Sequence, residues 1–322
     1  MAATELVRIE TLNNPAQNLS AAVECFLTYC RAKNLAENTV VYYAYRLEAF
    51  RRYLEHSHPV SGTAEIGRAV IRDFVRSEIE TRSPSTANHS VTTLRAFFGF
   101  LVREAILSEN PTTGVDKVRQ KRQLIETFSP NQLEAIMGTC GKDFAGVRDQ
   151  ALMLVLVDCG LRASEVCGLS VEDIDWKGRT IKVLGKGNIE RLVSYGESTG
   201  LALARYNARR FDVTTRAFFV SCYGDPLNRY RLRDIILRRC KQAGISGIRC
   251  SPHTFRHTFA VSYLRSGGDV FSLQKLLGHS DLTMTRRYCE LSQTDALERH
   301  RAYSPADALQ LVKARKGRKR IA

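Results

Sequence analysis

The chain of 322 residues is long enough for two domains with a core each, and its hydrophobic fraction of 44% is ordinary for a globular protein. Lysine and arginine outnumber acidic residues by 48 to 33. Residues 1–110 carry 12 basic and 12 acidic residues, so the whole excess of +15 lies in residues 111–322. This excess predicts a polyanionic partner. Nine cysteines without a Cys-x-x-Cys pair, and no apolar run near the ~18 residues that cross a bilayer, argue against a disulfide scaffold, a zinc site and a membrane protein.

Residues 1–18 show no hydrophobic period and are interpreted as a lead-in. From there to residue 110, apolar side chains recur every three or four positions, which is the spacing of helices that bury one face. The four apolar stripes are Val23–Cys30, Val40–Leu54, Ile66–Ile79 and Val91–Leu101. Asn38 is a candidate N-cap of the second helix, and Ser83-Pro84-Ser85 separates the third from the fourth. Residues 19–110 are therefore predicted to form a helical domain, whose fourth helix ends before Asn110-Pro111.

Residues 111–128 have the composition of a linker, with Pro111, Gly114 and few apolar positions. The basic residues of this segment that are candidate contacts to a DNA backbone are Lys117, Arg119, Lys121 and Arg122. The same composition suits a connector in solvent, so both interpretations stay open.

A second domain is predicted over residues 129–300. It begins at Ser129-Pro130-Asn131-Gln132, which combines an N-cap, a proline at the first helical position and a capping-box glutamine. Gly160 is placed to end an apolar helix, Ser164 to cap a short helix after it, and Gly185-Lys186-Gly187-Asn188 to form a hairpin turn. The predicted helices are 133–139, 147–159, 201–209, 231–243, 270–277 and 283–291, and the predicted strands are 179–184, 189–194 and 217–221.

The run from Ser251 to Ala260 is polar and basic within this otherwise apolar region. Ser251 is a favourable N-cap and Pro252 suits the first helical position, so a helix is predicted to begin here. His253 and Arg256 then lie one turn apart on one face, where both can donate hydrogen bonds to the same spot.

Residues 301–322 are predicted to be a C-terminal segment with a flexible basic tail, because their charges lack apolar anchors. The tail residues expected to contact DNA are Lys313, Arg315, Lys316, Arg318, Lys319 and Arg320. The predicted fold class is mainly α with a small antiparallel β-sheet, in which a helical domain precedes an α+β domain.

The polar residues of the second domain have ordinary structural explanations when they are taken singly. Arg162 follows a glycine and could bind the carbonyls of the preceding helix end. Lys186 suits a solvated turn, His253 suits a helix start, and Tyr288 suits a core position with a solvated hydroxyl. Their order and spacing along the chain carry more information than any one of them.

In chain order these residues form the pattern Gly160-Leu161-Arg162-Ala163-Ser164-Glu165, Gly185-Lys186-Gly187, His253-x-x-Arg256, Leu276-Leu277-Gly278-His279 and, nine residues later, Tyr288. This pattern resembles the tyrosine recombinase family of phage-integrase-like and Xer-like site-specific DNA recombinases. The resemblance covers roughly residues 19–300. It implies a core-binding, DNA-binding domain over 19–110 and a catalytic domain over 129–300.

The resemblance implies an enzyme that cleaves and rejoins double-stranded DNA at a specific recombination site. The residues implied in catalysis are Arg162, Lys186, His253, Arg256, His279 and Tyr288, with Glu165 in support. Tyr288 would attack a phosphodiester to form a 3′-phosphotyrosyl bond, Arg162 and Arg256 would bind the phosphate, and Lys186 would protonate the leaving 5′-oxygen. Glu165 would orient Arg162 or His253.

The phosphotyrosyl bond retains the energy of the broken phosphodiester, so no cofactor is expected, neither ATP nor a metal ion. Both a phosphate loop of the Gly-x-x-x-x-Gly-Lys-Ser/Thr type and a Rossmann glycine pattern are missing from the sequence, in line with this expectation. The scattered cysteines fit a reducing cytosol, so a cytoplasmic protein is expected. The family further implies that it acts as a homotetramer on two duplexes. Integration, excision, resolution and inversion all stay open as outcomes.

Other classes of protein were weighed against this interpretation. Glu172, Asp173 and Asp175 form an acidic cluster that could hold Mg²⁺ in a nuclease or transposase, although an ordinary acidic loop explains it better. A DNA-binding protein without activity would account for the basic charge, and topoisomerase-like relaxation uses the same cleavage and religation. His253 and His257 do not match a zinc protease motif, because Thr254 stands where glutamate is required. His257 is predicted to be a buried or helix-packing residue.

Overall fold

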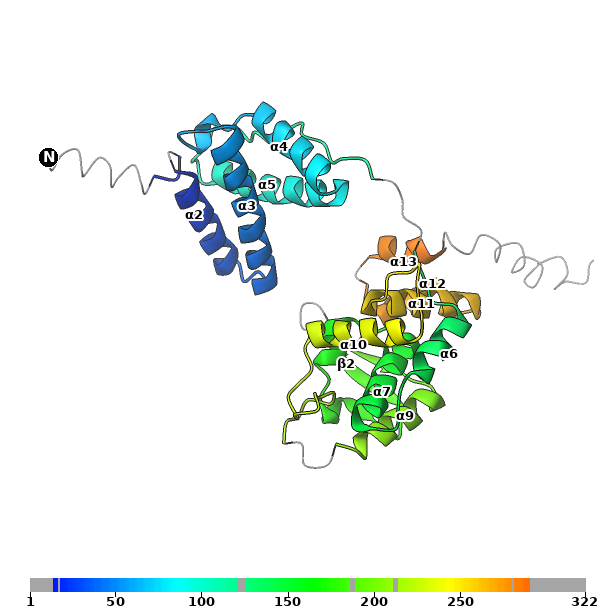
Figure 1. Ribbon diagram of the computed structural model, residues 1–322. Helices are drawn as coiled ribbons and strands as arrows, with labels where there is room; N and C mark the ends of the chain where they lie inside the picture. The colour runs from blue at the N-terminus through cyan, green and yellow to red at the C-terminus, as the bar shows by residue number, and fades with distance from the viewer. Residues whose placement is uncertain are drawn as a thin grey trace, which may run out of the picture. The chain divides into compact units, whose positions relative to one another are not determined.

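A computed structural model of the chain describes residues 14–16, 18–120, 125–185, 189–210, 214–279 and 281–289. The described part is mainly helical and includes a three-stranded antiparallel sheet, which confirms the predicted fold class. The chain divides into two compact units, Met1–Gln123 and Leu124–Ala322, here called unit 1 and unit 2 (Figure 1). The division falls inside the segment 111–128 that the sequence suggests as a linker.

Unit 1 contains the four helices that its apolar stripes predict. Its described elements are α2 (Leu19–Ala32), α3 (Glu37–Ser57), the 3-10 helix η1 (Thr63–Glu65), α4 (Arg68–Thr81) and α5 (Pro84–Arg103). The helices α2 and α3 pack on each other, and α4 packs on α5. Aromatic side chains fill the space between the helices, since Phe26, Phe50, Phe74 and Phe98 are all at most 2% exposed. Burial of such large side chains gives unit 1 its own core.

Two details of the helix starts differ from prediction. The helix α3 begins at Glu37, after Ala36 and without a side-chain cap, so Asn38 lies within the first turn and the prediction of an Asn38 cap is wrong. Ser83 and Pro84 do more than separate two helices, because the Ser83 hydroxyl accepts a hydrogen bond from the Thr86 N–H and Pro84 is the first helical residue. The helix α5 therefore begins well before its apolar stripe.

Residues 111–120, the last described residues of unit 1, pack against its helices. Asn88 in α5 holds Val118 through two hydrogen bonds, one from Nδ2 to the Val118 carbonyl (2.8 Å) and one from the Val118 N–H to Oδ1 (2.6 Å). Val115 belongs to the core of unit 1 and is 3% exposed. Lys117 and Arg119 are exposed. The segment that carries them is held in place by the contacts of Val115 and Val118. The other two basic residues predicted to contact DNA in this segment, at positions 121 and 122, lie outside the described residues.

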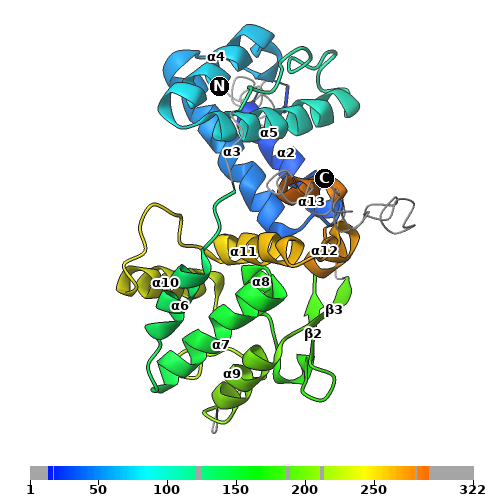
Figure 2. The same cartoon turned by 90° about the vertical axis from the view of Figure 1, so that its right-hand side faces the viewer.

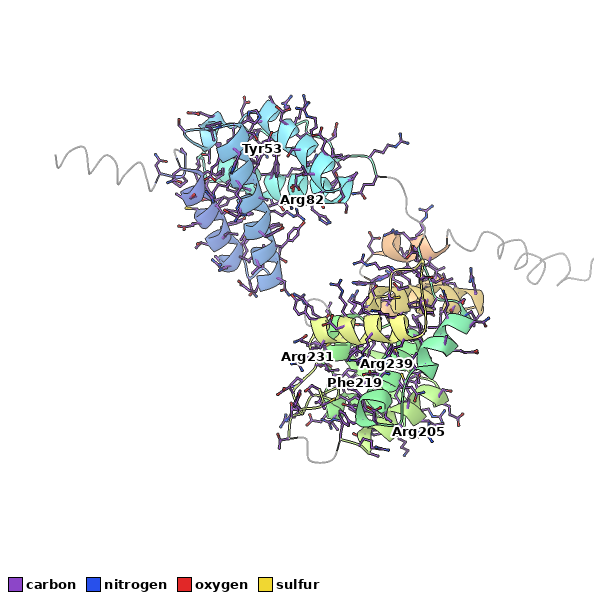
Figure 3. The ribbon with its side chains drawn as sticks, viewed as in Figure 1. Tyr53, Arg82, Arg205, Phe219, Arg231 and Arg239 are labelled. Carbon is purple, nitrogen blue, oxygen red and sulfur yellow. The ribbon has the colours of Figure 1, made fainter. Side chains whose placement is uncertain are left out.

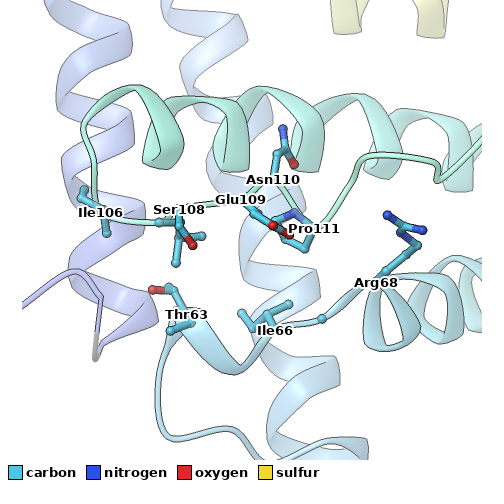
Figure 4. A pocket seen from close by; sticks show the side chains of 11 residues that line it. Thr63, Ile66, Arg68, Ile106, Ser108, Glu109, Asn110 and Pro111 are labelled. Carbon is cyan, nitrogen blue, oxygen red and sulfur yellow. The ribbon is translucent and has the colours of Figure 1, made fainter.

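Unit 1 also has a pocket of about 520 Å³ between the start of α4 and the segment that follows α5 (Figure 4). Ile66 and Ile106 contribute apolar surface to it, and Arg68 and Glu109 contribute charge. All of the predicted catalytic residues belong to unit 2, and none of them lines this pocket.

Unit 2 places an apolar helix at its centre. Its described helices are α6 (Pro130–Gly138), α7 (Phe144–Cys159), α8 (Ala163–Cys167), η2 (Val171–Asp173), α9 (Glu197–Asn207), α10 (Arg229–Gln242), α11 (Pro252–Arg265), α12 (Val270–Leu277) and α13 (Leu282–Cys289). The helix α7 lies beside α9 and α11 (Figures 1 and 2). The buried residues of α7 contact several neighbouring elements. Gly160 ends the helix, as predicted, and adopts the left-handed conformation.

The sheet of unit 2 has the order β1 (Ile174–Asp175), β2 (Thr180–Leu184), β3 (Glu190–Ser194), and all pairs are antiparallel. The pairing of Thr180 with Ser194 and of Leu184 with Glu190 confirms the predicted hairpin, while β1 was not predicted. The prediction of a strand over 217–221 is wrong. The described residues of that segment form only isolated bridges, because the chain turns back at Gly224 before a ladder can extend.

A buried ion cluster joins α7 to α10. Asp149 is 0% exposed and accepts hydrogen bonds from Arg148 (2.7 Å), Arg239 (2.7 Å) and Arg238 (3.1 Å). Arg239, labelled in Figure 3, also donates to the Thr139 carbonyl at the end of α6 at 2.7 Å. A buried carboxylate with several charged donors fixes the elements that carry them, because separating the partners leaves an uncompensated charge. This cluster secures the helix that precedes α11.

The described ranges contain no helix that combines the length and the apolar character needed to cross a bilayer.

Candidate active site

The helix α11 begins as the sequence predicts. The Ser251 hydroxyl accepts a hydrogen bond from the Thr254 N–H at 3.2 Å, and Pro252 is the first helical residue. Phe255 is fully buried and its ring packs against Phe128, which fixes the first turn to the core of unit 2. This anchoring determines where the neighbouring polar side chains of α11 point.

Arg256 is buried and joins three segments of unit 2. Its guanidinium donates to the carbonyl of Gly160 at 2.6 Å and to that of Leu277 at 2.7 Å, and it lies 3.0 Å from Nε2 of His279. A guanidinium can only donate, so Nε2 of His279 accepts, and the proton of the neutral ring is then on Nδ1, which is 3.0 Å from the Thr285 hydroxyl. Arg256 therefore links the end of α7, the end of α12 and the predicted catalytic His279.

Burial sets the protonation of this pair. Burial, together with the charges of Arg256, Arg162 and Arg191, lowers the pKa of His279 to about 4. Burial, together with the charge of Arg162, lowers the pKa of Arg256 to about 10. At neutral pH the imidazole is therefore neutral and the guanidinium is charged.

Arg162 and Glu165 form the capping box of α8. Glu165 accepts from the Arg162 N–H at 2.8 Å and from its guanidinium at 2.8 Å, and Arg162 also donates to the Gly278 carbonyl at 3.0 Å. Arg162 is the N-cap of this helix, so the predicted cap at Ser164 is wrong and Ser164 lies inside the helix. The bonds of Arg162 bring the start of α8 next to the Gly278-His279 segment.

Arg191 in β3 is a member of the site that the sequence motifs do not identify. It donates two hydrogen bonds of 2.8 Å to the two carboxylate oxygens of Glu165 and one of 2.9 Å to the Leu276 carbonyl. The signal that could have revealed it is strand alternation, since Arg191 lies on the same face of β3 as the buried Val193. A bidentate arginine holds a carboxylate in a fixed orientation. Glu165 is therefore oriented from two sides.

The carboxyl of Glu165 stays ionised in this environment. Its burial alone would raise the pKa, but hydrogen bonds from Arg191 and from Arg162 outweigh burial and lower the pKa of Glu165 below its usual 4.5. The negative charge of Glu165 thus balances part of the positive charge that Arg162, Arg191 and Arg256 bring together.

His253 lies at the exposed start of α11. Neighbouring protein atoms remove part of the water around the imidazole of His253, which lowers its pKa. The charges of Arg256, Arg249 and Arg162 act in the same direction. The predicted catalytic residues Arg162, His253 and Arg256 therefore share one electrostatic environment, and Arg256 connects it to His279.

Tyr288 lies in α13, which packs on α11 and α12, and its side chain is 5% exposed. Its hydroxyl is hydrogen-bonded to Nδ1 of His257 at 2.8 Å, and the two rings are in contact with centroids 5.6 Å apart. Burial raises the pKa of Tyr288, while the charges of Arg256 and Arg287 oppose the increase. His257 packs against a neighbouring helix, as predicted, and it also forms a hydrogen bond to Tyr288 that sequence spacing within α11 does not reveal.

Some predicted site residues lie outside the described residues, namely Lys186, Lys121, Arg122, Lys313, Arg315, Lys316, Arg318, Lys319 and Arg320. For the hairpin that carries Lys186, the described flanks are closed by a hydrogen bond of 2.8 Å from the Gly185 N–H to the Ile189 carbonyl. The base of this turn therefore continues the β2 and β3 ladder.

Two carboxylates of the acidic cluster after α8 accept hydrogen bonds from nearby residues, mainly from backbone N–H groups. Asp173 accepts hydrogen bonds from the N–H and hydroxyl of Ser170, and Asp175 accepts from the N–H groups of Lys177 and Gly178. Within the part of the chain that the structure describes, no group of three or more histidine, cysteine or acidic residues is arranged to hold a metal ion. These contacts support the interpretation of the cluster as an ordinary acidic loop.

Unit 2 thus gathers five of the predicted catalytic residues on neighbouring elements. They are Arg162 at the start of α8, His253 and Arg256 in α11, His279 after α12, and Tyr288 in α13. Arginine is the side chain best suited to bind a phosphate. These five are the residues, within a two-unit helical fold, that the sequence pattern assigns to the site of a tyrosine recombinase. Residues 126–294 match the phage integrase family, and residues 23–105 match the N-terminal SAM-like domain of phage integrases. The chain belongs to the phage integrase family of tyrosine recombinases, and it is a tyrosine-type site-specific recombinase.

Curated relatives agree over nearly the whole chain. Tyrosine recombinase XerC of Bacillus subtilis is 32% identical over 287 residues, which cover 86% of this chain and 94% of XerC. Tyrosine recombinase XerD of Pseudomonas aeruginosa is 33% identical over 282 residues, which cover 85% of this chain and 93% of XerD. The predicted family is therefore confirmed across both units.

Solved structures show the same fold. The XerH site-specific recombinase bound to a palindromic difH substrate aligns with a TM-score of 0.75 at 19% identity, over 92% of this chain and 98% of XerH. A lambda integrase dimer bound to a COC′ core site aligns with a TM-score of 0.68 at 18% identity, over 83% of this chain and 96% of the integrase fragment.

Proposed function

We propose that this recombinase binds double-stranded DNA at a specific recombination site and that Tyr288 attacks a phosphodiester to form a 3′-phosphotyrosyl bond. The observation that carries the proposal is the convergence of Arg162, Arg256 and His279 by hydrogen bonds of 3.0 Å or less around the Leu277-Gly278 carbonyls, next to the helix with Tyr288. Attack by a tyrosine on a phosphate requires such a group of donors, since negative charge develops on the non-bridging oxygens.

The two arginines bind the phosphate. Each guanidinium has five N–H groups, and the hydrogen bonds that Arg162 and Arg256 make with other described residues use only some of them. The side chain of Arg162 is 31% exposed and is open to DNA, whereas Arg256 lies deeper. Glu165 is a positioning residue that holds Arg162.

The remaining roles follow the family pattern. His253 donates to the phosphate oxygens, His279 positions Arg256 through Nε2, and Lys186 in the β2–β3 hairpin protonates the leaving 5′-oxygen. The energy of the phosphodiester is retained in the phosphotyrosyl bond, so rejoining needs neither ATP nor a metal ion.

We infer that the active assembly is a cytoplasmic homotetramer on two duplexes. The XerH and lambda integrase structures are described as complexes with recombination-site DNA, which supports double-stranded DNA as the partner of this chain. The basic residues at 117, 119, 121 and 122, and those of the tail at 313–320, supply backbone contacts.

A covalent trapping experiment tests this function. DNA sites that bind the chain are selected from a random-sequence library, and the best site is rebuilt as a nicked duplex whose cleaved fragment diffuses away. With EDTA present and ATP absent, we expect an adduct that survives denaturation in SDS. Binding without an adduct would indicate a DNA-binding protein without activity, and an adduct that EDTA abolishes would indicate a metal-dependent enzyme.

A further inference from the structure

His257 occupies the middle of α11, and none of the proposed roles uses it. It lies one turn after His253 and is half-buried. Its Nδ1 is 2.8 Å from the Tyr288 hydroxyl, which is within hydrogen-bond distance of the atom that attacks DNA in the proposed function. The contact of the two rings keeps the imidazole in place beside the phenol.

The Tyr288 hydroxyl needs a group that takes its proton. Burial raises the pKa of Tyr288, so the side chain is a neutral phenol at neutral pH. A phenol becomes an effective nucleophile when a base removes its proton during attack. The charged neighbours of this hydroxyl, Arg256 and Arg287, carry only donors and cannot accept that proton.

His257 is able to accept it. Burial first, and then His253, Arg287 and Arg256, lower the pKa of His257 to about 4, so the ring is neutral and has a lone pair at neutral pH. A DNA phosphate that enters beside Arg256 brings negative charge, which stabilises an imidazolium and raises the pKa of His257. The base is therefore weak in the free protein and strengthened by the substrate.

We propose that His257 is a catalytic residue that accepts the proton of Tyr288 in the cleavage step, an inference that rests on the proposed function. The Oη–H bond of Tyr288 breaks and its proton moves to Nδ1 of His257, while Oη forms a bond to phosphorus. The bond from phosphorus to the 5′-oxygen breaks, its electron pair leaves with that oxygen, and the oxygen takes a proton from Lys186. In religation each proton returns by the reverse path.

The variant His257→Asn tests the proposal. The asparagine amide stands where Nδ1 stood and keeps a hydrogen bond to Tyr288, but it does not take up a proton at neutral pH. With the nicked duplex in single turnover, we expect adduct formation to slow by about 100-fold or more at pH 7, at unchanged DNA affinity. If this variant does not fold, His257→Gln supplies the same comparison.

The pH profile separates proton transfer from mere packing. Without a base, hydroxide must remove the phenol proton, so the cleavage rate of His257→Asn should rise about tenfold per pH unit between about pH 6 and 9. The wild type should rise much less. The groups that face His257 are His253 and Arg256 on α11 and Arg287 and Tyr288 on α13, and all of them are retained in the variant.

Two controls isolate the step. A substrate with sulfur in place of the bridging 5′-oxygen needs no acid for its leaving group, so it should restore cleavage to Lys186→Ala and not to His257→Asn. Ser262→Ala, an exposed change on the same helix, should cleave at the wild-type rate.

The outcomes distinguish this inference from the function on which it rests. A wild type that forms no adduct overturns the proposed function and with it this inference. A wild type that forms the adduct, with a His257→Asn variant of equal rate and equal pH profile, overturns the role of His257 alone. Rescue of His257→Asn by the sulfur substrate would also overturn it, because it would place His257 on the side of the leaving group.

Discussion

In the proposed function, Arg256 combines a catalytic and a structural task in one buried side chain. It satisfies the buried carbonyls of Gly160 and Leu277, and a buried carbonyl left without a donor costs roughly 1–3 kcal/mol. We expect Arg256→Ala to lower the free energy of unfolding by about 3 kcal/mol and to abolish cleavage while DNA binding is retained. Urea denaturation, DNA affinity and adduct formation below the unfolding transition measure the three effects.

Arg162→Ala is the matched comparison, because the side chain of Arg162 is more exposed than that of Arg256. Its loss of stability should be nearer 1 kcal/mol, with an equally severe loss of cleavage. Unchanged stability in Arg256→Ala would contradict its structural task, and equal losses of binding and cleavage would mean that Arg256 is only a contact for DNA.

The ionisation of Glu165 should make the free energy of unfolding depend on pH. Its pKa in the folded chain is lower than the usual 4.5, so its contribution is fully present above pH 4.5 and is lost as pH falls through the folded pKa. At pH 7 Glu165→Gln should lower the free energy of unfolding by about 3 kcal/mol, because Arg162 and Arg191 lose a charged partner. Denaturation measured from pH 7 down to pH 3 should show this difference shrinking below pH 4.5. A difference that is constant with pH would contradict the ionised state of Glu165.

At the scale of elements, Gly160 is the junction between α7 and α8 that places Arg162. It has φ of +60°, and an added Cβ would overlap the ring of Phe259 in α11. We expect Gly160→Ala to lower the free energy of unfolding by about 3 kcal/mol, from backbone strain and crowding together. Thermal denaturation measures the change.

Gly244→Ala separates the two causes. Gly244 also has a positive φ, of +68°, but an added Cβ there would meet nothing within 4 Å. This variant should lose only about 1 kcal/mol, which is the cost of the left-handed conformation. Equal losses in the two variants would show that the contact with Phe259 is unimportant.

Most elements of this fold follow from local sequence. The capping box at Ser129, the cap at Ser251, the end of α7 at Gly160 and the hairpin of β2 and β3 are all encoded within a few residues. The cap at Ser164 was predicted wrongly because Glu165 reaches back to the Arg162 N–H and makes Arg162 the N-cap. Here a side chain of the site overrides the ordinary preference for a serine cap.

The sequence predicts only those site residues that the spacing of polar motifs along the chain reveals. The order of the polar residues identifies the family, but Arg191 and His257 take their roles from elements that fold onto them from elsewhere in the chain. Arg191 bonds to Glu165 across 26 residues, and His257 meets Tyr288 across 31 residues. Contacts of this kind depend on tertiary packing, which hydrophobic period and helix caps do not specify.

At the scale of the whole molecule, charge is distributed to suit a long polyanion. The excess of +15 lies after residue 110. Release of counterions makes the affinity for DNA fall with salt, by about 0.9 in the logarithmic slope for each phosphate contact. Deletion of residues 313–320 should therefore make the slope shallower by several such increments and leave cleavage of bound DNA intact. Titration of DNA binding at a series of salt concentrations measures the slope, and an unchanged slope would show that the tail does not contact DNA.

The most direct measurement concerns the atom that joins protein to DNA. After trapping on the nicked duplex, the adduct is digested with nuclease and protease, and the peptide that carries the remaining nucleotide is sequenced by mass spectrometry. We predict a nucleotide attached through its 3′-phosphate to Tyr288, and no adduct with Tyr288→Phe. An adduct on any other residue, or one that persists in Tyr288→Phe, would contradict the account.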